Sequence, residues 1–254
     1  MGKSESFDAN WDPKGYLEQY YAGEAITEDE VAILKSVVRF LEEAGTEFEE
    51  AIDVGSGPTI HHIIPLARYV KKIYLADYIE GNLKEIESWV EGDPNSHDWD
   101  VHIKGILDME GGATTPEAIA ERRKELRSRI AGYLKCDVFQ DDPLGEKRQF
   151  PLVTSFFCAD SVTDNKQDWE SIEQNVLSLV APGGWFVMSA LHEATSYKIG
   201  DKEFPSAHVS EEDVRRILTN SGFDPASMHI EVVKTDVFKE EGFDGIILAR
   251  AKKL

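Results

Sequence analysis

The sequence has little cysteine and no long hydrophobic run. Its 254 residues include two cysteines, Cys136 and Cys158, and one possible pair in a chain of this length makes no disulfide framework. The longest apolar stretch, Trp185–Leu191, is far too short to cross a bilayer and contains Ser189. The first ten residues are polar and lack the hydrophobic segment of an export signal. These features predict a reducing, cytoplasmic setting and no membrane insertion.

Positive charge is also scarce. The 27 lysine and arginine residues are outnumbered by 48 aspartate and glutamate residues, which leaves a net charge of −21. A surface of this sign repels nucleic acid backbones and anionic lipid headgroups, so neither is an expected partner. The seven histidines lack metal-site spacing with cysteine or carboxylate support, and no serine nucleophile elbow occurs. No metal cofactor is therefore expected.

The most informative feature that is present is an apolar strand running into a glycine turn. Residues 51–54 lead into Gly55, Ser56 and Gly57, and a second apolar strand ends at Asp77, about 20 residues after the first glycine. The Gly-x-Gly pattern lets the backbone turn tightly and lets a ligand approach main-chain N–H groups. A carboxylate at the end of the second strand is placed to accept hydrogen bonds from ribose hydroxyls. The pattern therefore predicts half of a nucleotide-binding fold.

Apolar periodicity along the chain predicts alternating helices and strands. The expected helices are Glu28–Ala44, Thr59–Tyr69, Gly81–Val90, Pro116–Ile130, Asp168–Leu179 and Ser210–Ser221. The expected strands are 51–54, 74–77, Tyr133–Val138, Leu152–Phe157, Trp185–Ser189, His229–Val237 and Gly245–Ala251. A weakly ordered loop is expected over Gly92–Glu121, where Asp, Gly, His and Thr are frequent.

This order of elements predicts one α/β domain, residues 1–254. The first five strands are expected to be separated by helices, which favours a parallel sheet. The last two are joined only by Phe238–Asp244, so they are expected to form an antiparallel edge pair. The fold class is therefore a Rossmann-like, doubly wound, seven-stranded sheet. Residues 46–254 would form the core, and residues 1–45 an N-terminal helical lid.

The glycine turn favours one nucleoside cofactor over another. A dehydrogenase fingerprint requires a third glycine, but Ile60 stands there, and Pro58 removes a backbone donor from the turn. An NAD-linked oxidoreductase is therefore a weaker hypothesis than an enzyme that uses S-adenosylmethionine. S-adenosylmethionine needs no pyrophosphate cradle, and Asp77 and Asp137 supply acids at two successive strand ends. A non-catalytic protein that only binds this cofactor is a third hypothesis.

An ordered set of motifs resembles a known family. The motifs are Tyr16–Tyr21, Asp53–Ile60, Asp77–Tyr78 with Asn82, and Lys135–Val138, followed in register by Asp98–Trp99, Pro182–Gly184, and Ile199–Gly200 with Lys202 and Phe204. From about Phe7 to Leu254 the chain is similar to the nicotinamide, phenylethanolamine and thioether/indolethylamine methyltransferases. The resemblance implies S-adenosylmethionine-dependent methylation of a small molecule, most often at nitrogen. Sulfur, oxygen or carbon acceptors are the alternative.

The resemblance also implies roles for individual residues. The implied cofactor-binding residues are Tyr21, Gly55, Ser56, Gly57, His61, Asp77, Tyr78, Asn82, Asp137, Val138 and Phe156. The implied substrate-binding residues are Tyr16, Tyr20, Phe157, Asp160, Ser189, Tyr197 and Ser206. Tyr16 and Asp160 are the candidate catalytic residues, and Asp160 would take a proton from an aliphatic amine, directly or through water. The protein is expected to be a monomer or a weak homodimer.

Two positions depart from the family's pattern. His61 stands where the nicotinamide enzymes carry a tyrosine that faces the cofactor, so imidazole would replace that contact or the contact is lost. Ser189 stands where the nicotinamide enzyme places an aspartate against the carboxamide. The second departure argues against nicotinamide as the acceptor. The expected reaction is in-line displacement at the methyl carbon, which mainly requires that the reacting atoms be held in line.

Overall fold

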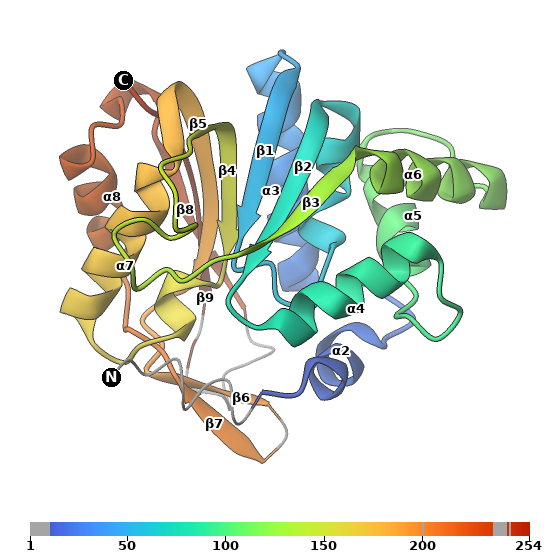
Figure 1. The fold of residues 1–254 in the computed structure, drawn as a ribbon, viewed down its shortest axis with the longest axis horizontal. Helices are drawn as coiled ribbons and strands as arrows, with labels where there is room; N and C mark the ends of the chain where they lie inside the picture. The colour runs from blue at the N-terminus through green and yellow to red at the C-terminus, as the bar shows by residue number, and fades with distance from the viewer. Residues whose placement is uncertain (1–10, 200, 236–242, 244) are drawn as a thin grey trace.

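The computed structural model describes residues 11–199, 201–235, 243 and 245–254. These residues form a central seven-stranded sheet in the order β3-β2-β1-β4-β5-β9-β8, with a small two-stranded sheet, β6-β7, below it in Figure 1. The strands of the large sheet are β1 Phe48–Val54, β2 Val70–Asp77, β3 Ile130–Lys135, β4 Phe150–Phe156, β5 Val180–Leu191, β8 His229–Lys234 and β9 Gly245–Lys252. The hairpin comprises β6 Ser196–Ile199 and β7 Lys202–Pro205.

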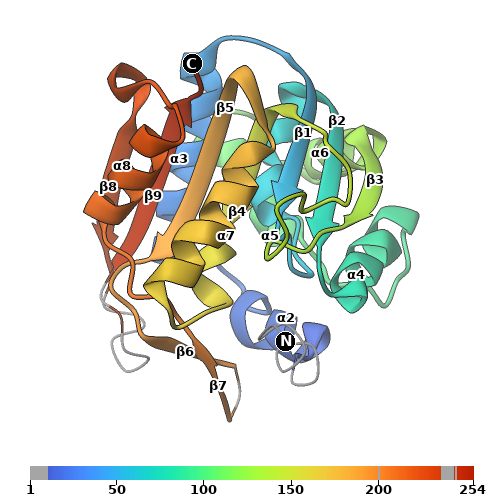
Figure 2. The same cartoon turned by 60° about the vertical axis from the view of Figure 1, so that its left-hand side comes forward.

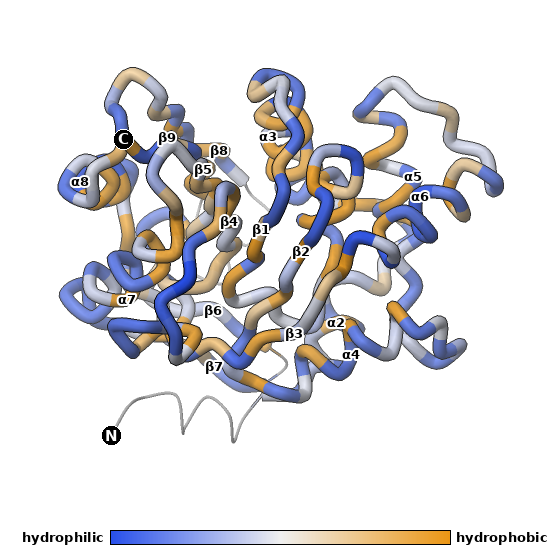
Figure 3. The backbone as a smooth tube through the Cα atoms, turned by 45° about the horizontal axis from the view of Figure 1, so that its top comes forward, coloured by the Kyte–Doolittle hydropathy of each residue, from blue (hydrophilic) through white to orange (hydrophobic). Residues whose placement is uncertain are grey.

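Helices cover both faces of the large sheet (Figure 2). The α-helices are α2 Pro13–Tyr21, α3 Glu28–Ala44, α4 Glu80–Glu91, α5 Asp100–Met109, α6 Pro116–Arg129, α7 Lys166–Ser178 and α8 Glu211–Asn220. One apolar core joins the sheet to α3, α5 and α6 through residues such as Leu34, Ile103 and Leu126. A second core joins the opposite face to α7 and α8 through Trp169 and Leu218. In Figure 3 hydrophobic stretches, drawn in orange, accordingly alternate with hydrophilic ones along the strands and helices.

The pairing of the strands confirms the predicted fold class. Strands β1 to β5 pair in parallel, and β9 runs antiparallel to both β5 and β8. The chain enters the sheet at β1, moves outward to β2 and β3, and returns to place β4 on the other side of β1. The order therefore reverses between β1 and β4, which is where open α/β sheets bind ligands beyond the carboxyl ends of their strands.

Two expected segments have a different local structure. The helix expected over Thr59–Tyr69 is instead two short 3₁₀ turns, η1 His61–Ile63 and η2 Pro65–Arg68. Pro65 lacks the amide proton that would bond to residue 61 in an α-helix, so it interrupts that register. The loop expected over Gly92–Glu121 contains helix α5, whose Ile103 and Ile106 are fully buried. Tertiary burial of this apolar face stabilises a helix that local composition did not favour.

The connections also differ from expectation. No helix separates β3 from β4, because the intervening residues 136–149 form turns. No helix or strand is predicted between Ser189 and Ser210, but Ser196–Ile199 and Lys202–Pro205 form the β6-β7 hairpin. Strand β3 ends at Lys135, so Asp137 and Val138 lie in the loop that follows it. The predicted connection Phe238–Asp244 and the end of the predicted strand His229–Val237 fall largely outside the described residues.

The lid assigned to residues 1–45 divides into two parts with different packing. Helix α3 packs into the core beside the sheet, whereas α2 crosses the carboxyl ends of the strands (Figure 1). Asp12 caps α2, and Pro13 occupies its first turn. Trp11 Nε1 donates to Asn82 Oδ1 at 2.7 Å on one side, and Tyr20 Oη donates to the carbonyl of Lys198 at 2.6 Å on the other. Helix α2 is thereby held between α4 and the hairpin, beyond the carboxyl ends of the strands and below them in Figure 2.

Candidate active site

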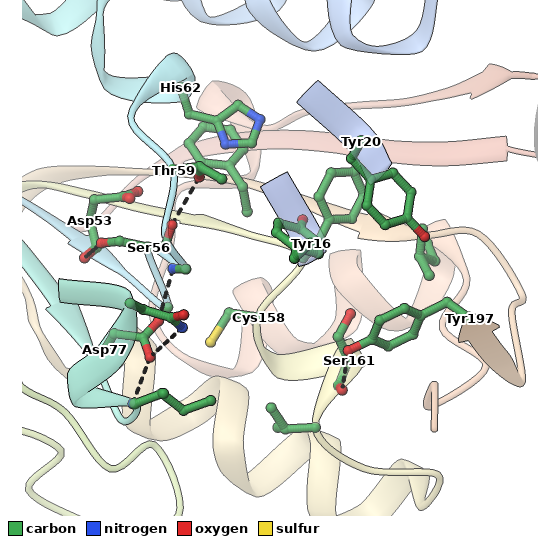
Figure 4. A pocket seen from close by; sticks show the side chains of 18 of the residues that line it. Tyr16, Tyr20, Asp53, Ser56, Thr59, His62, Asp77, Cys158, Ser161 and Tyr197 are labelled. Atoms are coloured by element: carbon green, nitrogen blue, oxygen red, sulfur yellow. Dashed lines mark hydrogen bonds between the residues drawn. The ribbon is translucent and has the colours of Figure 1, made fainter. Parts of the chain in front are cut away.

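A cavity of about 220 Å³ lies beneath α2, at the carboxyl ends of β1, β2 and β4 (Figure 4). Most of the residues that the sequence predicted for the site line it together. They are Tyr16, Tyr20, Tyr21, Gly55, Ser56, Gly57, His61, Asp77, Tyr78, Asn82, Asp137, Val138, Phe156, Phe157 and Tyr197. These residues come from separate segments of the chain, and the parallel sheet brings them together because it aligns its carboxyl ends along one edge.

The glycine turn after β1 forms the floor of the cavity. Gly55 and Gly57 have φ values of +71° and +59°, a region in which residues with a Cβ atom are strained. The amides of Gly55 and Ser56 both donate to the carbonyl of Ala76, at 2.8 and 3.1 Å. A Cβ atom at Gly55 would lie 2.3 Å from Cys158 Sγ, whereas one at Gly57 would meet no atom within 4 Å. Packing against Cys158 therefore requires a glycine at position 55, whereas position 57 requires one only for its backbone conformation.

Asp77 organises the beginning of the β2–α4 connection. Its Oδ2 accepts a hydrogen bond from the Gly57 amide at 2.8 Å, and its Oδ1 accepts from the Ile79 amide at 2.7 Å and from Asn82 Nδ2 at 3.1 Å. Burial raises the pKa of Asp77, and these three hydrogen bonds oppose that shift. A carboxylate offers about four acceptor sites. Asp77 therefore retains acceptor capacity in the cavity wall while it fixes the glycine turn.

A loop after β3 forms the wall on the β3 side. Asp137 Oδ1 accepts from the Phe139 amide at 3.1 Å, and Oδ2 accepts from Gln140 Nε2 at 3.2 Å. The Lys135 ammonium lies 3.6 Å from the centroid of the Tyr78 ring, a cation–π contact that fixes this ring at the edge of the cavity. Val138 lies buried beside Asp137. This wall combines apolar surface with a carboxylate, as a flat heterocycle bearing an amino group requires.

Three tyrosines of α2 form the roof. The hydroxyls of Tyr16 and Tyr21 lie 3.3 Å apart, and the centroids of the Tyr16 and Tyr20 rings are 5.1 Å apart. Burial raises the pKa of Tyr16 to about 12 and that of Tyr21 well above 10. Both hydroxyls therefore stay protonated at neutral pH and can donate to an anionic group. Tyr20 lines the cavity while its hydroxyl bonds to β6, so it also holds the roof in place.

Three predicted substrate-side residues do not line the cavity, so the structure does not support direct contact between them and an acceptor. Asp160 is 1% exposed, and its Oδ2 accepts from the Leu191 amide at 2.9 Å. Ser189 and Ser206 are also buried, and their hydroxyls have no hydrogen-bond partner among the described residues. Ser189 sits inside β5, paired with Phe156 of β4. These three side chains lie behind the wall that Leu191, Phe157 and Tyr197 present to the cavity.

The structure also adds residues that the sequence reasoning missed. The additional lining residues are Trp11, Thr27, Asp29, Glu30, Ile33, Asp53, Thr59, His62, Ile79, Cys136, Phe139, Cys158, Ser161, Val162, Leu191, Phe243 and Ile246. Thr59 and His62 lie within or beside the glycine-turn motif, so their positions gave a signal. The positions of Asp29 and Glu30 in the sequence gave no such signal, because acidic residues in the first turn of a helix are commonly exposed to solvent. Burial raises the pKa of Cys136 to about 12 and that of Cys158 well above 9, so both thiols are neutral.

A buried carboxyl group behind the cavity predicts how stability changes with pH. Burial, together with the nearby Asp160 carboxyl, raises the pKa of Glu173 to about 8; unfolded glutamate titrates near 4.3. Between these values the folded state binds more protons than the unfolded state, so stability falls as pH rises from about 5 to 8. We expect Glu173→Gln to remove the part of this decline that Glu173 causes, on the order of 5 kcal/mol for the full shift, measured by urea unfolding at several pH values. Glu170→Gln, an exposed change on the same helix, should leave the decline unaltered, and an equal effect of both variants would refute the assignment.

No group of three or more histidine, cysteine or acidic side chains in the described part of the chain is arranged to hold a metal ion. None of the helices formed by the described residues combines the length and apolar composition needed to cross a bilayer.

Comparison with known proteins gives consistent matches over nearly the whole chain. A family model described as the NNMT/PNMT/TEMT family matches residues 1–254. Nicotinamide N-methyltransferase of Homo sapiens is 30% identical over 86% of this chain and 84% of its own length. Phenylethanolamine N-methyltransferase of Sus scrofa is 27% identical over 96% of this chain and 89% of its own. Among solved structures, magnesium protoporphyrin IX methyltransferase of Synechocystis PCC 6803 with bound SAM superposes with a TM-score of 0.60 at 14% identity, over 99% of this chain and 97% of that one.

Proposed function

The chain belongs to the NNMT/PNMT/TEMT family, and we propose that it transfers the methyl group of S-adenosylmethionine to a nitrogen atom of a small molecule. The observation that carries this proposal is the cavity itself. It joins the glycine turn at the reversal point of the sheet, and Asp77 and Asp137 beyond β2 and β3, to an aromatic roof on α2. The strand-end edge suited to a nucleoside and the aromatic part of the cavity thus form one continuous site.

The side chains in the cavity fit S-adenosylmethionine. Asp77 and Asn82 would hold the ribose hydroxyls, since Asp77 keeps acceptor capacity after its three protein hydrogen bonds. Asp137 and Val138 would flank the adenine ring. The hydroxyls of Tyr16 and Tyr21 would serve the methionine portion, which would pass beside the glycine turn. When bound, this cofactor supplies an electrophilic methyl group on a positively charged sulfur.

The region beyond the methionine portion defines the acceptor class. Phe157, Leu191, Tyr197, Phe243 and Ile246 line the cavity on the side of β5, β9 and the hairpin. These walls are mostly apolar, so we propose a flat or apolar acceptor that carries one nucleophilic nitrogen. Ser189, which replaces the aspartate of the nicotinamide enzyme, is buried in β5. Nicotinamide itself is therefore not the proposed acceptor.

The protein's contribution to catalysis is mainly orientation and exclusion of water. Methyl transfer requires the acceptor nitrogen, the methyl carbon and the leaving sulfur to lie nearly in line, and fixing this geometry supplies much of the rate enhancement. The tyrosines of α2 cover the cavity, and the hydrogen bonds of Trp11 and Tyr20 hold that cover. The aromatic faces can also surround the positively charged sulfur, which cation–π contacts stabilise.

The proposal is tested by incubating the protein with S-adenosylmethionine labelled in the methyl group and a panel of amines, azaheterocycles, thiols and phenols. A labelled product on an amine or azaheterocycle is the expected result. Label on a thiol, a phenol or carbon would replace the proposed nitrogen acceptor with another atom. Binding of the cofactor without turnover on any acceptor would favour a non-catalytic role. A parallel titration with NAD should show no binding, and tight NAD binding would overturn the proposal.

We propose that Asp160 positions the cavity wall and does not itself take a proton from the acceptor. Its carboxyl bonds to the Leu191 amide, and Leu191 lines the cavity. Asp160→Asn keeps an acceptor for that amide, so we expect kcat to stay within about threefold. Asp160→Ala leaves a buried amide unpaired and should lower kcat/KM about tenfold, the equivalent of roughly 1.4 kcal/mol.

The pH dependence distinguishes the two roles of Asp160. Burial raises the pKa of Asp160 to about 7, so a proton-accepting role would place an acidic limb near that pH in the kcat/KM profile. A loss of 100-fold or more in Asp160→Asn, together with disappearance of that limb, would show that Asp160 is the base.

A further inference from the structure

His61 is a buried imidazole in the cavity wall that has no hydrogen-bond partner among the described residues. Its side chain is 1% exposed, and neither ring nitrogen makes a hydrogen bond. The ring is stacked on Trp99 with an interplanar angle of 8°, and its centroid lies 4.7 Å from that of the Tyr21 ring. Burying a polar ring without a hydrogen-bond partner costs free energy of folding. Packing therefore holds the ring in a fixed orientation, and both of its nitrogens remain available for hydrogen bonds.

Glu30 joins His61 to a second histidine. Glu30 Oε1 lies 3.5 Å from His61 Nε2, and Glu30 Oε2 lies 3.4 Å from His102 Nε2. Both distances are long for hydrogen bonds and would shorten if either imidazole gained a proton and a charge. Helix α3 supplies Glu30, the 3₁₀ turn η1 supplies His61, and α5 supplies His102. The three groups form a cluster that can accommodate an added proton.

Hydroxyl donors lie beside this cluster on the cavity side. Tyr16 and Tyr21 share one hydrogen bond between their hydroxyls, and two hydroxyls carry two protons, so one O–H remains available to a further acceptor. Tyr21 contacts His61 directly. Together these groups present a hydroxyl donor and a protonatable nitrogen to the same part of the cavity. That combination suits a carboxylate.

The proposed function places a carboxylate at this end of the cavity, and the present inference rests on it. With adenine beside Asp137 and ribose beside Asp77, the methionine portion continues past the glycine turn toward η1 and the roof. Its terminal α-carboxylate then reaches Tyr16, Tyr21 and His61. We propose that His61 takes up a proton as this carboxylate binds, so that the cofactor and its demethylated product both bind with uptake of a proton.

Other titratable groups around His61 determine the sign of the effect. Helix α2 contributes Tyr16 and Tyr21 on this side of the cavity, and helix α3 contributes Asp29 and Glu30. The other three groups are histidines: His62 of the same turn, His97 of the segment before α5, and His102 of α5. Burial lowers the pKa of His61 well below 6.5, and His62, His102 and His97 lower it further. The imidazole is therefore neutral in the free protein at pH 6.5. A carboxylate that contacts the His61 ring raises that pKa, and this effect exceeds the opposite effect of the ligand's α-ammonium because the carboxylate is the group in contact.

Linkage then determines how affinity changes with pH. The complex binds one more proton than the free protein and ligand, so affinity increases as pH falls. Between the low pKa of the free state and the raised pKa of the complex, the association constant changes by about tenfold per pH unit. Above the pKa of the complex the dependence disappears. This behaviour would not arise if a tyrosine, which stays protonated throughout this range, stood at position 61.

The test is calorimetric titration of the full chain with S-adenosylhomocysteine at pH 6.5 in two buffers of different ionisation enthalpy, PIPES and bis-Tris. We expect the wild type to take up between half a proton and one proton per ligand bound. His61→Tyr should bind the ligand with an uptake near zero. The matched control, His229→Tyr on strand β8 outside the cavity lining, should retain the wild-type uptake.

A second ligand tests the same inference without any substitution. Methylthioadenosine has the nucleoside and sulfur but neither the carboxylate nor the ammonium of the amino-acid end, so it should bind the wild type without proton uptake. Equal uptake with both ligands, or unchanged uptake in His61→Tyr, would overturn the assignment to His61 and the carboxylate. Binding of S-adenosylhomocysteine with no uptake in the wild type would overturn this inference alone. A failure of S-adenosylhomocysteine to bind would overturn the proposed function as well.

Discussion

Asp77→Asn should weaken binding of S-adenosylhomocysteine about 100-fold. The side chain would lose its charge, and an NH₂ group would face one of the amides of Gly57 and Ile79 that now donate to the carboxylate. Hydrogen bonds to a charged acceptor contribute roughly 1.5 to 3 kcal/mol each, and loss of two ribose bonds amounts to about 3 kcal/mol, or about 100-fold. Calorimetric titration measures the change in Kd.

The matched control for Asp77→Asn is Asp93→Asn. Asp93 follows α4, and its Oδ1 accepts from the amide and the side chain of Asn95 in an exposed turn. It makes the same type of local contact outside the cavity lining, so its replacement should leave Kd within twofold. Thermal unfolding of each variant separates loss of affinity from loss of fold. If folded Asp77→Asn bound the ligand within threefold of the wild type, Asp77 would not hold the ribose.

Gly55→Ala should destabilise the protein by about 3 kcal/mol. The backbone there has a φ of +71°, which costs a residue with a Cβ atom roughly 1 to 2 kcal/mol. The added methyl group would also lie 2.3 Å from Cys158 Sγ and 2.6 Å from Cys158 Cβ, and relief of such a clash in a packed core costs about 1 to 3 kcal/mol. Chemical denaturation measures the total.

Gly57→Ala separates the two contributions. Its φ is +59°, but a Cβ atom there would meet nothing within 4 Å. The backbone cost remains without the clash, so we expect a loss of about 1 kcal/mol. The double variant Gly55→Ala with Cys158→Gly removes the clashing side chain and should be more stable than the sum of the single changes predicts. Equal destabilisation by Gly55→Ala and Gly57→Ala would show that Cys158 does not restrict the turn.

Strongly patterned segments allowed the fold to be predicted from the sequence. The helix Glu28–Ala44 has the predicted bounds, because its apolar periodicity and the terminal Gly45 agree with its tertiary packing. Helix α5 and the hairpin β6-β7 were missed, because their stability comes from packing against distant segments. Pro65 was present in the sequence, and its effect on an α-helix over Thr59–Tyr69 was underestimated.

In the candidate site, too, some residues could be predicted from local sequence and others depend on tertiary packing. Asp77 and the glycine turn could be predicted because the chemistry requires these residue types at a fixed spacing along the chain. Glu30 could not be predicted, because nothing local distinguishes a helix-terminal acid in solvent from one buried against His61 and His102. Asp160 follows β4 as expected, but its carboxyl turns behind the wall to bond with Leu191, a partner 31 residues away.

The sequence by itself determined the fold class, the family and the edge of the sheet at which the cavity lies, because hydrophobic periodicity and the glycine-turn spacing are local properties of the chain. Only the tertiary structure decided which polar side chains face the cavity and which lie behind its wall. A side chain's exposure and charge state depend on burial and on neighbours that separate elements supply. For that reason the partners of Glu30, the orientation of Asp160 and the burial of His61 became apparent only once the sheet and its helices had been assembled.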